Sequence, residues 1–108
     1  MGEIINRVKT RFRGEEVDDE LLQELVVTAK DRIKLRVGVD EFPPALDSIA
    51  VDVTVKAYRR KYFEGVSSEN ADSISTTFVE DILKEYSIEL DAWKEKNESG
   101  GKTMVKFL

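Results

Sequence analysis

The side chains that could do chemistry in this sequence are carboxylates, lysines and hydroxyls, because its 108 residues include no cysteine and no histidine. Without cysteine there is no disulfide, thiolate metal ligand or thiol nucleophile. Without histidine the usual general base is missing, so a Ser–His or Cys–His nucleophile cannot form. No pair of carboxylates stands apart as a general acid and base. We therefore expect no enzyme activity and no catalytic, cofactor-binding or metal-binding residues.

Two local patterns approach known binding motifs, and each lacks an essential part. Gly101–Lys102–Thr103 matches the end of a phosphate-binding loop, but the position five residues before Gly101, where the motif requires glycine, is Lys96. The acidic pairs Asp18–Asp19 and Asp40–Glu41 could attract a hard cation, but neither has the ligand spacing of a calcium loop. Helix capping and solvation of a turn explain these acids as well.

The charge distribution argues against binding to nucleic acid. The formal net charge is −5; residues 1–63 carry twelve basic and twelve acidic side chains, whereas residues 64–108 carry five and ten. Affinity for DNA comes from Lys and Arg side chains that displace counterions from phosphates, and an acidic chain supplies few of them. This unequal distribution of charge between the two parts of the chain would suit subunits that pack head to tail.

The first elements expected to position these side chains are two amphipathic helices. Apolar residues at helical spacing predict an N-terminal helix within residues 1–13. Its other face is basic, which could contact an acidic partner or a membrane surface, or could simply be solvated. A stripe from Leu22 to Val37 predicts a second helix over residues 19–37, with Asp18 as N-cap and Gly38 at its end. The bases near its C-terminus complement the helix dipole.

Residues 45–63 fit two patterns. The β-branched residues between Ile49 and Val55 alternate as in a strand, yet the apolar residues from Leu46 to Tyr58 also fit one helical face. The uninterrupted stretch is too long for a typical strand and follows two prolines, which suit a helix start. We therefore predict a helix.

Beyond residue 65 the pattern predicts a polar loop, a short strand, a helix and a tail. Alternation of Ile74, Thr76 and Phe78 predicts the strand, near residues 73–78. Thr77 and Glu80 form a capping box, which predicts a helix from there to about residue 97.

The last residues, 98–108, are expected to form a flexible tail after a Gly-Gly break. Residues 103–108 could form a second strand, either beside residues 73–78 or added to a neighbouring subunit. The expected fold is thus a single domain over residues 1–108, mainly α, with about four helices packed as a small bundle and a helical core over residues 19–97.

The order of the segments carries a further indication. It runs from DELLQELVVTAKDRIKLRVG through a proline turn to PALDSIAVDVTVKAYRRKYFEG, then a Ser-rich loop, SSENADSISTTF, an acidic helix, VEDILKEYSIELDAWKEK, and a short apolar end, VKFL. This order resembles the head–tail connector (adaptor, head-completion) family of siphophages and prophages of Gram-positive hosts, over residues 15–108.

The resemblance implies a structural virion protein that needs no cofactor. Members of the family are small helical proteins that join a ring beneath the portal protein, extend the DNA channel and dock the next connector or tail-completion protein. The implied partners are therefore other copies of the chain, as a dodecamer in the virion, the portal protein and the tail-completion protein. Phage DNA would pass through without specific binding, and no membrane is involved. The implied location is the virion neck, after assembly in the host cytoplasm.

Contacts with neighbouring subunits are expected at the Ser-rich loop, at the tail and at Ile88, which falls outside the apolar stripe of its helix. The residues expected there are Ile74, Phe78, Ile88, Met104, Val105, Phe107 and Leu108. An acidic channel would let DNA slide without sticking. The acids expected to face it are Glu69, Asp72, Glu80 and Asp81.

Other functions are also compatible with the residues. A small helical DNA-binding protein of a phage or mobile element would use Arg59, Arg60 and Lys61. A small regulator would act by helix-in-groove contact. An enzyme built on carboxylates alone would need an acid/base pair that the pattern does not reveal.

Overall fold

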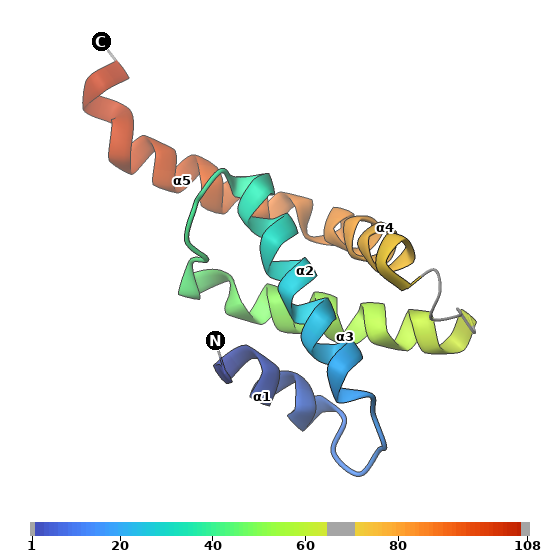
Figure 1. Ribbon diagram of the computed structural model, residues 1–108. Helices are drawn as coiled ribbons and strands as arrows, with labels where there is room; N and C mark the ends of the chain where they lie inside the picture. Colours follow the sequence, from blue (N-terminus) through green and yellow to red (C-terminus); the bar gives the residue numbers. More distant parts are fainter. Residues whose placement is uncertain (1, 65–70, 107–108) are drawn as a thin grey trace.

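A computed structural model shows a helical protein. It describes the backbone of residues 2–64 and 71–106 and the side chains of residues 4–60 and 76–97. The elements in chain order are α1 (Gly2–Arg11), α2 (Asp19–Val37), the 3-10 helix η1 (Pro44–Leu46), α3 (Asp47–Glu64), α4 (Ala71–Leu83), the 3-10 helix η3 (Lys84–Tyr86) and α5 (Ser87–Lys106) (Figure 1). No strand occurs in these ranges, and the mainly α fold class is confirmed.

Helix α3 lies at the centre of the bundle. It packs against α1, α2 and α4, and α2 also contacts α4 and α5. The buried apolar side chains form one core that runs from Ile4 in α1 to Leu90 in α5. Beyond this core, α5 extends away from the bundle (Figure 1). In the described part of the chain, no helix is both long enough and apolar enough to cross a membrane.

Local signals set the ends of α2, as the sequence predicted. The Asp18 carboxylate accepts a hydrogen bond from the backbone N–H of Leu21 at 3.1 Å, which satisfies one of the free donors of the first turn. At the other end, Gly38 has φ 76°, and its N–H donates to the carbonyl of Lys34. This left-handed conformation suits glycine because it has no Cβ.

The structure also confirms that residues 45–63 are helical. Side chains of α3 are buried on several sides, among them Val51, Val53, Thr54 and Val55. Burial on several sides follows from the central position of α3 between three other helices. A helix of this kind needs apolar residues around most of its circumference, which is why its sequence also looked like an alternating strand.

The predicted strand at 73–78 is wrong, because these residues belong to α4. The helix begins at Ala71, so Thr77 lies in its interior and the capping box predicted there is not a helix start. Ile74 and Phe78 are four residues apart, as are Phe78 and Ile82, so the same residues also fit one helical face. Helical periodicity, which continues through Leu83, prevails over a strand pattern of only a few residues.

The helix predicted from Thr77 to about residue 97 is interrupted. Residues 84–86 form the 3-10 turn η3, and α5 begins at Ser87, whose hydroxyl donates to the carbonyl of Lys84 at 2.9 Å.

The candidate strand at 103–108 is also not found. Residues 103–106 are the last residues of α5, which continues through the predicted Gly-Gly break, and residues 107–108 lie outside the described residues. A strand needs a neighbour for its backbone hydrogen bonds, and the described part of the chain offers none.

Candidate interaction surface

Large apolar side chains are exposed at three positions among the described residues. Val27 is 49% exposed and Leu35 is 70% exposed, both on α2, and Ile88 in the first turn of α5 is 85% exposed. Single exposed apolar residues are common on protein surfaces. Two on the same helix, beside a groove, are a better reason to look for a partner.

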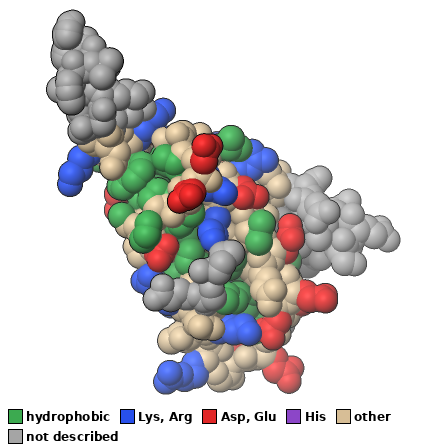
Figure 2. All heavy atoms as spheres, turned by 60° about the vertical axis from the view of Figure 1, so that its left-hand side comes forward, with side chains coloured by type: hydrophobic (Ala, Val, Ile, Leu, Met, Phe, Trp, Pro, Cys, Tyr) green, Lys and Arg blue, Asp and Glu red, His purple; other side chains and the backbone are tan. Residues whose placement is uncertain are grey.

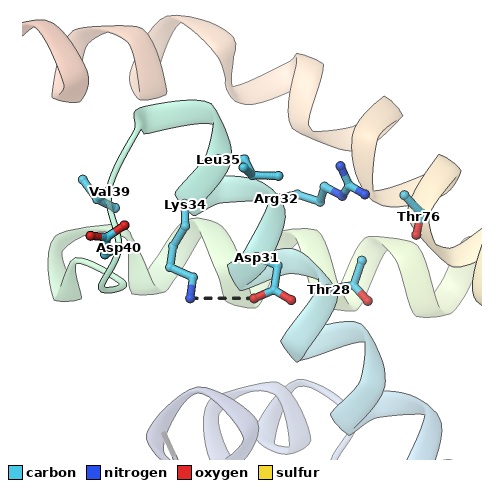
Figure 3. Close-up of a pocket in the computed structure, with 8 residues that line it drawn as sticks. All are labelled: Thr28, Asp31, Arg32, Lys34, Leu35, Val39, Asp40 and Thr76. Carbon is cyan, nitrogen blue, oxygen red and sulfur yellow. Dashed lines mark ion pairs between the residues drawn. The ribbon is translucent and has the colours of Figure 1, made fainter.

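The groove lies along the outer side of α2 and has a volume of about 540 Å³ (Figure 3). Leu35 lines it, and Lys34 forms an ion pair there with Asp31 at 3.8 Å. The complete lining, which also includes residues of the turn after α2 and one residue of α4, is Thr28, Asp31, Arg32, Lys34, Leu35, Val39, Asp40 and Thr76. Both signs of charge are present beside apolar groups, as at protein–protein contacts.

Bases of α2 pair with acids of other helices. Arg32 forms an ion pair with Glu80 of α4 at 3.4 Å, and Arg36 with Asp91 of α5 at 3.0 Å. Dipole complementarity, the reason expected from the sequence, is therefore only part of their role. These ion pairs tie α2 to the two helices that follow α3.

Arginines of α3 are also paired within the chain. Arg59 forms an ion pair with Glu15, and Arg60 with Asp81, both at 3.3 Å. Each guanidinium also lies over an aromatic ring, that of Phe12 at 4.6 Å and that of Phe78 at 4.4 Å. Such contacts stabilise a cation in place. Arg59 and Arg60, which a DNA-binding protein would direct at phosphates, instead hold neighbouring elements of the fold.

The face of the molecule seen in Figure 2 has no basic stripe. Acidic and basic side chains are interspersed on this face, with hydrophobic side chains between them. A nucleic-acid-binding face concentrates Lys and Arg instead.

Polar contacts also join α3 to the turn η3. Lys56 donates a hydrogen bond to Glu85 at 2.9 Å, and its ammonium lies 5.1 Å from the ring centroid of Tyr86. Hydrogen bonding to Glu85 first, and to Tyr86 second, raises the pKa of Lys56 above its ordinary value. Asp52 accepts hydrogen bonds from Arg11 at 2.6 Å and from Tyr86 at 3.3 Å, so it links α1, α3 and η3.

Among the residues predicted to contact neighbours, Ile88 and Phe78 have described side chains. Ile88 points into solvent, whereas Phe78 is only 6% exposed and lies under Arg60, so its burial is accounted for within the chain. Ile74, Met104 and Val105 lie in α4 and α5, but their side chains are outside the described residues. Phe107 and Leu108 are outside them altogether.

The four predicted channel acids are described in part. Glu80 and Asp81 are partly exposed, and they form the ion pairs with Arg32 and Arg60. Asp72 lies in the first turn of α4 with its side chain outside the described residues, and Glu69 is outside them entirely. Val27 and Leu35 were not predicted as contact residues, although both fall outside the apolar stripe of α2, which is the signal that had indicated Ile88.

The part of the chain that contains this surface matches a known protein family. The model of the family described as "Phage gp6-like head-tail connector protein" matches residues 5–94, most of the chain. The chain belongs to this family. The match runs from α1 into the first half of α5, so it includes the connector's buried core except Ile4, its groove, and the three large apolar residues that are exposed in the described part of the chain. No curated protein and no solved structure matches the chain.

Proposed function

We propose that this connector forms a ring between the portal and the tail of a long-tailed phage that infects Gram-positive bacteria. The ring, a dodecamer in the virion, extends the DNA channel and docks the next connector or tail-completion protein. It assembles in the host cytoplasm and resides in the virion neck. The observation that carries the proposal is the family match over residues 5–94. The composition supports a structural role, because a chain without histidine and cysteine lacks the usual catalytic groups.

The channel wall in this proposal carries acids from the region around α4. Glu69, Asp72, Glu80 and Asp81 face the lumen, where negative charge repels the phosphates of the passing DNA. Glu80 and Asp81 have the partial exposure that this requires, and their ion pairs with α2 and α3 would hold them in fixed positions. The pairs reduce the local charge, so the effect would depend on all four acids together.

The contacts with neighbouring proteins involve α5. Ile88, in the first turn of α5, is almost fully exposed. A partner that buried this side chain would gain about 1.5 to 3 kcal/mol of binding free energy. The apolar side chains of Ile74, Met104, Val105, Phe107 and Leu108 are further contacts in this proposal.

The experiment that tests the proposal is light scattering after size-exclusion chromatography, with the chain alone and with purified portal protein. We expect a ring-sized species, alone or bound to portal. A variant with Ile88→Asp should keep the fold, because this side chain is 85% exposed, and should associate less. A chain that stays monomeric and never associates with portal would contradict the proposed function.

A further inference from the structure

The outward side of α2 has an unusual composition for a solvent-exposed helix face. Five residues of α2, beginning with Glu20 and spaced four, three, four and four positions apart, lie on one face of the helix. Every side chain in this set is exposed, and we call it the α2 outer stripe: Glu20, Glu24, Val27, Asp31 and Leu35. It lies opposite the buried side of the helix, so no element of the described chain covers it.

Two of the three exposed large apolar residues belong to this stripe. Val27 and Leu35 are placed two turns apart, and Leu35 also lines the groove beside α2. Apolar residues on an outer helix face have no role in the core of their own chain. A partner that covered the stripe would remove them from water, which favours association.

The charges of the stripe are acidic and largely unpaired. Glu20 and Glu24 form no ion pair among the described side chains, while Asp31 pairs only with Lys34 of the same helix. A partner that fits the stripe should therefore be basic, with apolar stems beside its charges.

The same chain carries such a surface on α1 and the turn that follows it. Lys9 and Arg11 form ion pairs with Asp19 and Asp52, but Arg7 and Arg13 have no partner among the described side chains and are exposed. Arg7 lies away from the buried face of α1, and Arg13 lies in the turn that directly follows this helix, so both belong to the basic N-terminal region that the sequence left without an assigned role. Arginine stems can cover an apolar neighbour such as Val27 while the guanidinium groups stay near carboxylates.

We propose that the basic surface formed by α1 and the turn after it, with Arg7 and Arg13, binds the α2 outer stripe of the next copy of the chain. This inference rests on the proposed ring and assigns the two faces that would join its subunits. Because the faces differ, the contact is heterologous, which is the type that generates a ring when the rotation closes.

The dimensions and the position of the two faces fit this arrangement. At about 1.5 Å per residue, the ten residues of α1 span about 15 Å, which matches the stripe from Glu20 to Asp31 and leaves Leu35 to the following turn or beyond this contact. Only residues 12–18 separate α1 from α2, so α1 and the N-terminal part of the stripe lie at the same end of the molecule, whereas the C-terminal end of α2 reaches α5 (Figure 1). Copies related by rotation would therefore bring them to the same level.

Charge reversal with rescue tests the contact under the conditions in which the wild-type chain assembles, alone or with purified portal. One variant carries Arg7→Glu and Arg13→Glu, and the other carries Glu20→Arg and Glu24→Arg. We expect each variant alone to associate roughly tenfold less, or weaker still, because like charges then meet across the contact. Mixing the two should restore assembly, since each altered face then meets a complementary one on the other variant.

Two further measurements separate this contact from a loss of folding. Glu41→Arg with Asp47→Arg makes the same charge change as the α2 variant, but between α2 and the first turn of α3 and outside every proposed contact, and it should leave assembly unchanged. Because the chain has no cysteine, Thr10→Cys combined with Val27→Cys should give a ladder of disulfide-linked oligomers, whereas each single variant should not.

The outcomes distinguish this inference from the proposed function. If the wild type forms rings and both reversed variants assemble as well as it does, the contact is wrong while the ring stands. The contact is equally wrong if the mixture is not rescued although both variants keep their thermal unfolding transitions. If the wild type assembles under no condition, the proposed function fails and the inference fails with it.

Discussion

At the scale of single residues, the surroundings of a side chain decide its contribution, as two leucines of α2 illustrate. Leu25 is completely buried in the core, whereas Leu35 is mostly exposed. We expect Leu25→Ala to lower the free energy of unfolding by about 2 to 5 kcal/mol, because it leaves a cavity in a packed interior. Leu35→Ala, the matched control on the same helix, should change it by less than about 0.5 kcal/mol. Urea unfolding followed by circular dichroism measures both, and equal losses would contradict this core.

Lys56 offers a prediction about electrostatics at one residue. Its pKa is raised because the ammonium form donates to Glu85 and lies near Tyr86. Since the folded pKa exceeds the unfolded one, the resulting stabilisation is present below the unfolded value of 10.5 and disappears as the pH rises through the folded pKa. The side chain is half exposed, so the energy involved is small.

The Lys56 prediction can be checked by following the Cε resonance of this lysine by NMR as a function of pH. Glu85→Gln should lower the apparent pKa toward its ordinary value. Glu89→Gln removes a carboxylate that makes no ion pair among the described side chains, and it should have no effect. A pKa that is insensitive to Glu85→Gln would rule out this hydrogen bond as the cause.

Residue patterns predicted the candidate site only in part. The exposure of Ile88 follows from its place outside the apolar stripe, and the same criterion applied to α2 would have indicated Val27 and Leu35. Phe78 is apolar and lies beside the predicted loop, so it resembled a contact residue. Phe78 belongs to the buried core, with Arg60 of α3 over its ring, and no local pattern reveals such neighbours.

At the scale of elements, the boundaries of α2 were predictable because local chemistry sets them. Gly38 occupies a left-handed conformation, and a Cβ there would meet no neighbouring atom, so any cost of substitution comes from the backbone. We expect Gly38→Ala to destabilise the fold by about 1 kcal/mol. Gly38→Asn should cost less, because asparagine tolerates this conformation better. Thermal unfolding of both variants measures the difference, and an alanine variant as stable as the wild type would contradict this C-cap.

The break between α4 and α5 was not predictable for the opposite reason. Residues 77–97 have a helical pattern throughout, so local signals favour one continuous helix. The turn η3 instead lies where Asp52 and Lys56 of α3 contact Tyr86 and Glu85. Those contacts join residues 34 and 29 positions apart, and their effect on the chain direction appears only once α3 and α4 are packed.

At the scale of the whole molecule, the mainly α class followed from composition and periodicity, but the arrangement of the helices did not. The ion pairs Arg11–Asp52 and Arg36–Asp91 link positions 41 and 55 residues apart. Each is at the surface and worth little alone. Such pairs within the chain involve Lys and Arg side chains of α2 and α3 that, from the sequence alone, could also have bound another molecule. Arg7 on α1, and Glu20 and Glu24 on the outer side of α2, form no ion pair among the described side chains, and the proposed contact uses them.

The extension of α5 beyond the core gives a prediction for the entire chain. Every buried apolar residue of the described part lies between Ile4 and Leu90. Deleting residues 98–108 should therefore change the free energy of unfolding by less than about 1 kcal/mol, since surface truncations remove little packing. If these residues bind a neighbouring subunit or the portal, the same deletion should reduce co-elution with portal. Full-length Leu25→Ala is the control, because it lowers stability while keeping the tail. A deletion that unfolds the chain would show that the tail belongs to the core of its own subunit.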